Sequence, residues 1–409
     1  MNTVVTGIGL ISSLGKNLET SWENLILDRI GISLKQPFLE LTARPLALID
    51  EQPTNAIELT QLAVAAALKD AGLEPPLVDC GVVIGSSRSQ QAAWEEIQKS
   101  KVKSQKKGVR SQKNLISSAH LLTCSPTPHS RFPTPDSPIP TPEFIETLPN
   151  AIATAAARQI GTTGVVLAPM AACATGIWAI AQGTLLINTG QCQRVIVGAV
   201  EAPITPLTLA GFGQMGALAT TGAYPFDRYR EGLVLGEGAS ILVLESAELA
   251  QQRAAKIYGQ VLSFGLTNDA YHANQPEPTG KSAIAAIKQC LERSNLTPQD
   301  TDYIHAHGTA TQLNDKREAQ IIEYLFGRRV PVSSTKGATG HTLGASGAIG
   351  AAFCLMALRH QVLPPCTGLR SPAFDLDLVT APRYVKVENT LCFSFGFGGQ
   401  NAVMSFGRW

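Results

Sequence analysis

The sequence predicts an α/β fold, because short β-branched runs alternate with longer Ala- and Leu-rich stretches from the first residues onward. An apolar fraction of 44% and a charged fraction of 16% are typical of a compact chain with a large core. With 409 residues, the chain is long enough for about two to three average domains or for one large α/β unit.

The first half of the chain supplies the clearest alternation. We expect strands at residues 3–6, 81–84, 165–168 and 194–200, and helices at residues 57–71 and 148–160. After Cys173 comes a run of about sixteen residues, almost all apolar or small, which stops at Gly190. This run predicts a helix that is buried on all sides between strands.

Near Ser246 the pattern starts again. We expect helices at residues 247–255, 281–294 and 343–358, and strands at residues 257–264 and 303–305. The chain therefore divides into an N-terminal half, 1–250, and a C-terminal half of similar make-up, 251–409.

One segment, about residues 99–142, does not share this rhythm. It contains seven Lys or Arg residues between positions 99 and 113 and seven prolines between positions 126 and 142. Such a composition predicts a solvated, largely disordered insertion. It is either a tolerated surface loop or an electrostatic contact for an acidic partner.

Composition excludes several classes of protein. A formal net charge of +1 gives no indication of nucleic acid or of an anionic membrane as a partner. The eight cysteines form no CxxC pair and have no ligand-like spacing with histidine, so neither a zinc site nor a disulfide framework is expected. Neither a leader-like start nor an uninterrupted apolar run of membrane-spanning length is present. We expect a soluble protein of a reducing compartment.

Cys173 is the first candidate for chemistry. It stands between the expected strand 165–168 and the N-terminus of the buried helix. Unpaired backbone N–H groups and the helix dipole favour a thiolate at such a position. A nucleophile on a strand-to-helix turn is a recurring device for acyl transfer, although cysteine is also a common core residue.

Histidines in two Gly-rich turns support the catalytic interpretation. His305 and His307 follow the expected strand at 303–305, and alternation along that strand predicts that they face the same side. His341 ends the run Ser334-Thr335-Lys336-Gly337-Ala338-Thr339-Gly340-His341, which enters the small-residue helix 343–358. Near the end, Phe397 stands between glycines in Gly396-Phe397-Gly398-Gly399, where a loop can offer N–H groups and move an aromatic side chain.

Taken together, these segments resemble the elongating β-ketoacyl-acyl carrier protein synthases (synthase I and II) of the thiolase superfamily. The resemblance extends from Val4-Val5-Thr6-Gly7-Ile8-Gly9 to the C-terminal end, apart from about residues 88–142. It also includes Pro225-Phe226-Asp227, Arg230-Glu231-Gly232, Gly236-Glu237-Gly238-Ala239 and Asp269-Ala270-Tyr271-His272. It implies a thiolase-like, five-layered αβαβα fold of two related halves, with the active site at their junction.

The resemblance also implies roles for individual residues. Cys173 matches the acylated nucleophile of the family. His307 and His341 match the pair that stabilises the enolate formed when a malonyl thioester loses carbon dioxide. Lys336 matches the lysine behind that pair, and Glu318 matches an acidic residue of the same network.

Further matches concern the supporting network and the substrate. Asp315 stands in the same run as Glu318, Asp315-Lys316-Arg317-Glu318. Thr309 and Thr311 resemble the hydroxyls that hold the pantetheine arm, and Phe397 resembles the gate to the acyl pocket. The backbone N–H groups of Cys173 and Phe397 match the two oxyanion donors.

The implied reaction is a decarboxylative Claisen condensation of an acyl thioester with malonyl-acyl carrier protein, giving 3-oxoacyl-acyl carrier protein. The pathway is fatty-acid synthesis or a related lipid or polyketide route. Acyl carrier protein is the implied partner, a cytoplasmic homodimer is the usual state, and no metal or redox cofactor is expected. The chain departs from the family pattern at Ala171, Tyr224, Asn274 and the insertion, all in regions that concern substrate or partner recognition.

Four alternative interpretations fit the sequence less well. A catalytically silent chain-length-factor-like subunit would not need to retain Cys173, His307, His341 and Lys336. A papain-like hydrolase lacks its usual context around the cysteine. A dinucleotide-binding enzyme would need a glycine where Ser12 stands, and a serine hydrolase would need a Gly-x-Ser-x-Gly elbow, which the sequence does not contain.

Overall fold

The computed structural model describes residues 2–99 and 146–409. The predicted insertion at 99–142 therefore lies almost entirely outside the described residues. The strands of the first half are β1 (Thr3–Ser12), β4 (Gly81–Gly85), β5 (Val166–Leu167), β6 (Arg194–Glu201) and β7 (Gly238–Ser246). Those of the second half are β8 (Gly259–Asn268), β9 (Tyr303–His305), β10 (Val332–Ser333), β13 (Asn389–Gly396) and β14 (Gln400–Gly407).

Helices lie between these strands. In the first half they are α1 (Leu18–Ile26), α2 (Ala56–Ala71), α5 (Ala151–Ile160), α6 (Thr175–Asn188), α7 (Pro206–Gln214) and α8 (Ala247–Gln252). In the second half they are α9 (Lys281–Arg293), α10 (Gln312–Phe326), α11 (Lys336–Thr339) and α12 (Ser346–His360). Two small hairpins pair β2 (Ser33–Lys35) with β3 (Arg44–Leu46) and β11 (Val362–Leu363) with β12 (Arg383–Tyr384).

The two halves share one strand topology. The described strands form a ten-stranded sheet whose order is β5-β4-β6-β7-β1 in one half, continued by β8-β14-β13-β9-β10 in the other. The five strands of each half can be numbered by their order along the chain. From the junction outward, the strands of both halves then follow the order first, fifth, fourth, second, third. The first two pairings are antiparallel and the last two are parallel in both halves. The prediction of two related halves is therefore confirmed, while the exact boundary at residue 250 stays a prediction.

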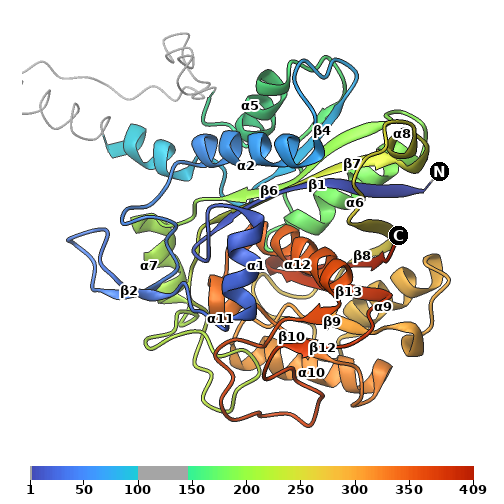
Figure 1. The fold of residues 1–409 in the computed structure, drawn as a ribbon. Coiled ribbons are helices and arrows are strands. Elements are labelled where there is room, and N and C mark those ends of the chain that lie inside the picture. Colours follow the sequence, from blue (N-terminus) through green and yellow to red (C-terminus); the bar gives the residue numbers. More distant parts are fainter. Residues whose placement is uncertain (1, 100–145) are drawn as a thin grey trace, which may run out of the picture.

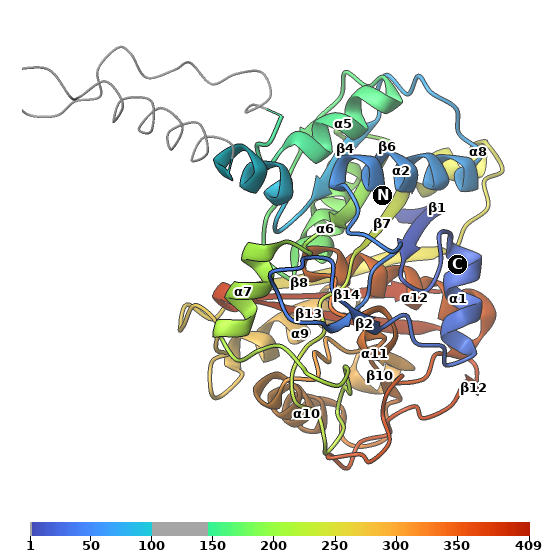
Figure 2. The ribbon, with the colours of Figure 1, turned by 90° about the vertical axis from the view of Figure 1, so that its left-hand side faces the viewer.

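Five layers are visible in Figure 1. Helices α2 and α5 cover the outer face of the first-half strands, α6 and α12 fill the middle, and α9 and α10 cover the outer face of the second-half strands. Separate groups of buried side chains occupy the three helix–sheet contacts, and the largest of them surrounds α6 and α12. The five-layered αβαβα arrangement is thus confirmed. Figure 2 shows α7 beside this stack, at the height of its middle layers.

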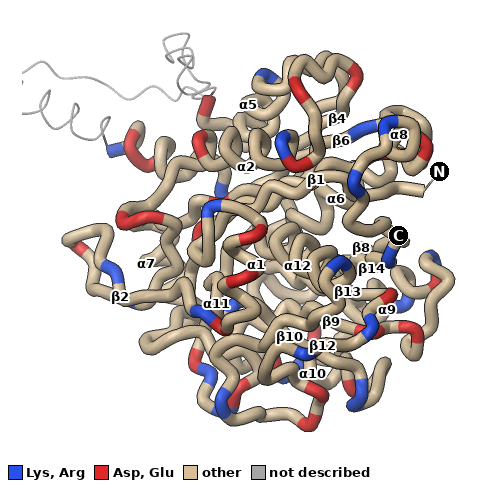
Figure 3. The backbone as a smooth tube through the Cα atoms, in the orientation of Figure 1, with Lys and Arg blue, Asp and Glu red and all other residues tan. Residues whose placement is uncertain are grey.

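The middle helix α12 explains a sequence feature that resembles a membrane span. Within the described residues, the stretch Leu343–His360 is the one helical segment long and apolar enough to cross a membrane. However, 89% of that stretch is buried inside the fold, as expected for a core helix. On the outside, Figure 3 shows both signs of charge interspersed over the face in view, in keeping with the small net charge.

Candidate active site

Cys173 lies where the sequence places it, between β5 and the first turn of α6. The turn is tight, because Ala171 and Cys173 form an isolated β-bridge across Ala172, whose φ is +47°. Ser394 of β13 fixes the same turn from the other half, since its hydroxyl donates to the Cys173 carbonyl oxygen at 2.9 Å. The predicted nucleophile is thus held by contacts from both halves.

The thiol of Cys173 is not a thiolate at rest, contrary to the expectation from its place at a helix N-terminus. Burial raises the pKa of the Cys173 thiol to about 11. The charge of Lys336 and the backbone N–H of Phe397 act in the opposite direction but do not outweigh burial. Attack by Cys173 therefore requires a neighbouring base to accept its proton.

A pocket of about 310 Å³ opens above the cysteine. Its lining includes the nucleophile, two histidines, two threonines and the aromatic gate residue: Cys173, His307, His341, Thr309, Thr311 and Phe397. The three remaining predicted residues, Lys336, Glu318 and Asp315, do not line the pocket and lie behind it. The structure thus brings together all the predicted site residues, six around the pocket and three behind it.

Cys173, His307 and His341 are close neighbours. The Cys173 sulfur and one ring nitrogen from each histidine all lie within 4.8 Å of one another. The two imidazole rings stand edge to face, with centroids 5.4 Å apart and an interplanar angle of 82°. The same three side chains also have the spacing of a metal-binding set such as a zinc site, so the expected absence of a metal stays a prediction.

His307 follows β9 and is fixed mainly through its backbone. Its N–H donates to one Glu318 carboxylate oxygen at 2.6 Å, and the N–H of Gly308 donates to the other at 2.7 Å. The ammonium of Lys336 donates to the His307 carbonyl oxygen and lies 3.4 Å from its Nδ1. Because an ammonium can only donate, Nδ1 is an acceptor and Nε2 carries the proton.

His341 precedes α12 and is held in a short ladder. Its N–H donates to the Val234 carbonyl at 2.6 Å, and the Gly236 N–H donates to its carbonyl at 3.1 Å. The Oγ of Ser346 lies 2.9 Å from the ring Nδ1 of His341. With the hydroxyl as donor, Nε2 of His341 also carries a proton, so both imidazoles can donate toward the pocket.

Both histidines are neutral. Burial lowers the pKa of His307 and of His341 well below the usual value, and the charge of Lys336 lowers both further. Neutral imidazoles can donate one N–H each without bringing a net charge into the pocket. When Nδ1–H of His341 donates to Ser346 instead, its Nε2 is free and can accept a proton from the pocket.

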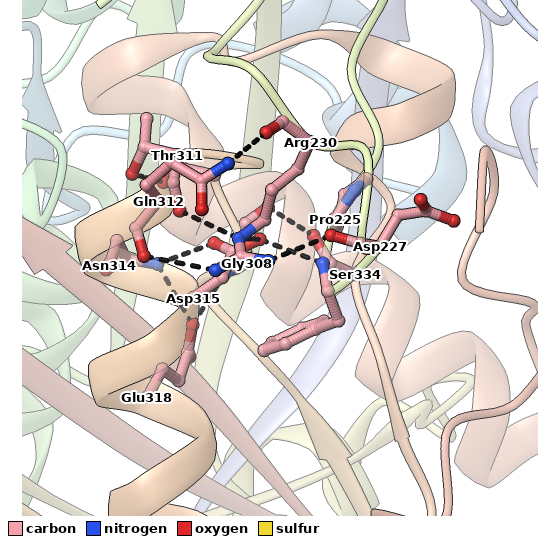
Figure 4. Close-up of polar contacts among 12 residues, drawn as sticks. Pro225, Asp227, Arg230, Gly308, Thr311, Gln312, Asn314, Asp315, Glu318 and Ser334 are labelled. Atoms are coloured by element: carbon pink, nitrogen blue, oxygen red, sulfur yellow. Dashed lines mark hydrogen bonds and ion pairs between the residues drawn. The ribbon is translucent and has the colours of Figure 1, made fainter. Parts of the chain in front are cut away.

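A buried polar network supports the histidine side of the pocket, and Figure 4 shows its members. Asp315 accepts the N–H of Phe226 at 2.8 Å and lies 4.0 Å from the Arg230 guanidinium. Arg230 also donates to the carbonyl oxygens of Thr311 and Gln312 at 3.3 and 3.2 Å. The network therefore ties the loop after His307 to the loop that contains Phe226 and Arg230.

Burial also shifts the acids of this network. It raises the pKa of Glu318 to about 7 and that of Asp315 to about 6, and it lowers the pKa of Lys336. The N–H groups of Gly308 and His307 favour the ionised form of Glu318 but do not outweigh burial.

The hydroxyls of Thr309 and Thr311 lie 2.9 Å apart at the pocket wall.

Phe397 lines the pocket and is 36% exposed. Its ring stacks on that of Phe212 in α7, with centroids 6.0 Å apart and an interplanar angle of 24°. Its backbone N–H faces the Cys173 sulfur. This position suits both predicted roles, a movable aromatic side chain and an oxyanion donor.

Two further site features differ from the sequence interpretation. β9 ends at His305, so the strand alternation does not continue to His307. His305 instead packs inside the protein, with Nε2 3.1 Å from the Thr335 hydroxyl, and does not line the pocket. Glu201, which the sequence analysis missed, ends β6 fully buried and accepts N–H groups from Ser87 and Gly344 at 2.9 and 2.8 Å. The sequence signal for Glu201 was an acidic residue at the end of an otherwise apolar strand.

The model of the beta-ketoacyl synthase N-terminal domain matches residues 129–250, and that of the C-terminal domain matches residues 258–370. The 3-oxoacyl-[acyl-carrier-protein] synthase 2 of Staphylococcus aureus (strain MRSA252) is 31% identical over 439 residues, covering 100% of this chain and 99% of that protein. The protein of the same name from Synechocystis sp. is 40% identical over 263 residues, covering 61% and 63%.

Solved structures with a similar fold include ketosynthases from several systems. One is a type II polyketide ketosynthase bound to a hexaketide, in complex with its acyl-carrier protein, and another is the ishigamide ketosynthase/chain length factor. Each has a TM-score of 0.85 and 26% identity and covers 100% of this chain and 99% of the other. A beta-ketoacyl synthase from Burkholderia phymatum STM815 has a TM-score of 0.82 and 25% identity, with the same coverage.

Proposed function

The chain belongs to the β-ketoacyl synthase family, and we propose that it condenses an acyl group held on Cys173 with malonyl-acyl carrier protein to give 3-oxoacyl-acyl carrier protein. The protein is an acyltransferase of the 3-oxoacyl-acyl carrier protein synthase type. The observation that carries the proposal is the cluster of the Cys173 sulfur with the nitrogens of His307 and His341 within 4.8 Å.

The first half-reaction transfers the acyl group. The Cys173 sulfur attacks the thioester carbonyl carbon, and its proton passes to Nε2 of the neutral His341, in the tautomer whose Nδ1–H donates to Ser346. The N–H groups of Cys173 and Phe397 stabilise the oxyanion. When the intermediate collapses, the C–S bond to the carrier breaks, and the carrier thiol leaves with a proton.

The second half-reaction breaks the carbon–carbon bond of a malonyl thioester. The electron pair of the breaking C–C bond forms the C=C bond of an enolate, the π pair of the thioester carbonyl moves onto its oxygen, and carbon dioxide leaves. The Nε2–H groups of His307 and His341 donate to this enolate oxygen. The enolate carbon then attacks the acyl-Cys173 carbonyl, and the Cys173 thiolate is released.

Lys336 and Glu318 act behind the histidines in this scheme. Glu318 fixes the backbone of His307 and Gly308, and Lys336 fixes the tautomer of His307. Thr309 and Thr311, at the pocket wall, are placed to bind the pantetheine arm of the carrier. The scheme uses no metal or redox cofactor.

The partner is an acyl carrier protein, and the pathway is fatty-acid synthesis or a related lipid or polyketide route in the cytoplasm. A homodimer fits the edge strand β5, whose free edge has no partner among the described strands. Four apolar side chains are exposed on β5 and next to it in the chain: Val165, Val166, Leu167 and Met170. Light scattering of wild type and Val166→Lys tests this state, and a wild-type monomer overturns it.

Intact mass spectrometry tests the reaction itself. Wild type, Cys173→Ala and the control Cys192→Ala are incubated with a panel of acyl-carrier-protein thioesters, with and without malonyl-acyl carrier protein. We expect an acyl adduct on wild type and Cys192→Ala that malonyl carrier consumes, and none on Cys173→Ala. An adduct on Cys173→Ala contradicts the nucleophile assignment. No adduct on any variant favours the alternative, a catalytically silent chain-length-factor-like subunit.

A further inference from the structure

His305 is a buried histidine that the proposed reaction does not use. It ends β9, directly before Ala306 and His307, and is 2% exposed. Its backbone pairs with Ser333 of β10 on one side and with Cys392 of β13 on the other. Because burying a polar group without a partner is costly, both nitrogens of such a ring require hydrogen-bond partners.

Both ring nitrogens of His305 have such a partner. Nε2 lies 3.1 Å from the Thr335 hydroxyl, and Nδ1 lies 4.0 Å from the Cys392 sulfur. A hydroxyl and a thiol can each donate or accept, so both nitrogens are satisfied in either neutral tautomer. Gly350 of α12 packs against the ring, since a Cβ on this glycine would lie 2.8 Å from Cε1 and Nδ1 of His305. The ring is therefore fixed by contacts from three elements.

Thr335 connects this ring to the active site. It is the N-cap residue of α11, but its hydroxyl makes no cap hydrogen bond within the part of the chain that the structure describes. A threonine hydroxyl at an N-cap usually accepts an N–H group of the first helical turn, which stabilises the helix. Here the hydroxyl contacts His305 instead. The start of α11 is thus tied to the end of β9.

Lys336 is the first residue of α11, and its ammonium contacts His307. It donates to the His307 carbonyl oxygen and lies 3.4 Å from Nδ1 of the same residue. A lysine has a flexible four-carbon stem, so the position of its ammonium depends on how firmly its backbone is held. The contact between Thr335 and His305 fixes the residue directly before Lys336. A shift of this residue would move the ammonium away from Nδ1 of His307.

We propose that His305 is a positioning residue for malonyl decarboxylation: through Thr335 it fixes the start of α11 and so holds the Lys336 ammonium against His307. Nδ1 of His307 then stays an acceptor, and its Nε2–H donates to the enolate oxygen. His305 itself does not touch the substrate. The inference deepens the proposed function and rests on it for the reaction, whereas the tautomer of His307 can be measured without any substrate.

Two substitutions break the contact, one from each side. His305→Leu removes both ring nitrogens, and Thr335→Val removes the hydroxyl but keeps the shape of the side chain. In both variants, we expect single-turnover decarboxylation of malonyl-acyl carrier protein to fall about three- to tenfold, the factor that corresponds to one hydrogen bond. Acylation of Cys173 should keep its wild-type rate, because it does not use the Nε2–H group of His307.

A conservative variant and a spectroscopic signal separate positioning from a general loss of structure. In His305→Gln, the amide reaches about as far as Nε2 and can donate or accept there, so decarboxylation should return to near the wild-type rate. NMR of the imidazole nitrogens reports the tautomer of His307, whose signals are assigned by their loss in His307→Ala. In His305→Leu and Thr335→Val, the Nδ1 signal of His307 should move toward its protonated form.

Thr184→Val is the matched control, because Thr184 is also buried and its hydroxyl donates to the Ile180 carbonyl oxygen within α6. It should change neither half-reaction nor the His307 signals. Wild-type decarboxylation in both His305→Leu and Thr335→Val overturns the inference, and so does an equal loss of acylation and decarboxylation. If His305→Leu does not fold, Thr335→Val and His305→Gln decide. A wild type that does not decarboxylate malonyl carrier contradicts the proposed function, while the His307 signals still test the role of His305.

Discussion

Gly176 of α6 lies so close to Ala348 of α12 that a Cβ on the glycine would be 2.4 Å from the Ala348 nitrogen. The contact is reciprocal, since a Cβ on Gly347 would lie 2.8 Å from a side-chain carbon of Ile177. Cys173 precedes α6 and His341 precedes α12, each in the corresponding place of its own half. The crossing of these two helix starts therefore brings Cys173 and His341 together.

Gly176→Ala should destabilise the protein, because the added methyl group meets backbone that cannot move aside. We expect a loss of about 1–3 kcal/mol, typical of overpacking in a core. Urea unfolding followed by circular dichroism measures it. Gly211→Ala is the control, since it adds the same group in open space on a helix. Equal midpoints for Gly176→Ala and wild type would mean that the helix crossing is not tight.

Sequence patterns predicted several elements and the main residues of the site. The alternation of β-branched and Ala-rich runs predicted β4, β6 and α9 to within about two residues, because periodicity is local information. Motif order pointed to Cys173, His307 and His341 as one site. The pKa of Cys173 could not be predicted in this way, because burial depends on the packing of both halves, whereas the helix dipole is visible in the sequence.

Glu201 and Ser346 are two residues near the site that sequence patterns did not indicate. Each acts through contacts with residues distant in the chain or with a histidine ring: Glu201 joins Ser87 to Gly344, and Ser346 sets the tautomer of His341. Neither has a spacing that marks it. Their roles follow from the positions of their partners in space, which a single sequence does not supply.

His307→Ala and His341→Ala should each lose condensation more severely than acylation. Removing one donor to a developing oxyanion costs about 100- to 1000-fold in rate. Acylation of Cys173 uses the backbone N–H groups to stabilise its oxyanion, so it should fall less, and in His341→Ala it should fall only by the loss of the proton acceptor. Single-turnover assays separate the two steps, with His360→Ala as the control, because His360 stacks on Trp22 outside the pocket. Unchanged malonyl decarboxylation in both site variants contradicts the enolate role.

Alkylation of Cys173 should accelerate with pH far above neutrality. The thiolate is the reactive form, and burial raises the pKa of this thiol to about 11. The iodoacetamide rate should therefore rise about tenfold per pH unit between pH 7 and 10 without a plateau, since the thiolate fraction rises tenfold per unit below the pKa. A plateau near pH 7 would indicate a resting thiolate and would restore the expectation from the helix N-terminus.

Glu237 gives a prediction for stability, because burial raises the pKa of its carboxyl to about 7. It accepts the N–H groups of Thr54 and Ile49 at 2.8 and 3.3 Å, and its neighbour Gly236 donates to the His341 carbonyl. An unfolded glutamate has a pKa of about 4.3. The folded state therefore binds the proton more tightly, and this contribution is complete below about pH 4 and lost as pH rises toward 7.

Glu237→Gln keeps a neutral acceptor in place and should remove this loss. We expect the free energy of unfolding of the variant to fall less than that of wild type between pH 4.5 and 7.5, by about 1.4 kcal/mol for each unit of pKa shift. Urea titrations at four pH values measure the slopes. Glu231→Gln is the control, because its hydroxyl partners lower the pKa of Glu231 to about 2, so its contribution changes only in more acidic solution. Parallel curves for Glu237→Gln and wild type mean that Glu237 is not the proton-binding group, and the ladder that holds His341 is then insensitive to pH in this range.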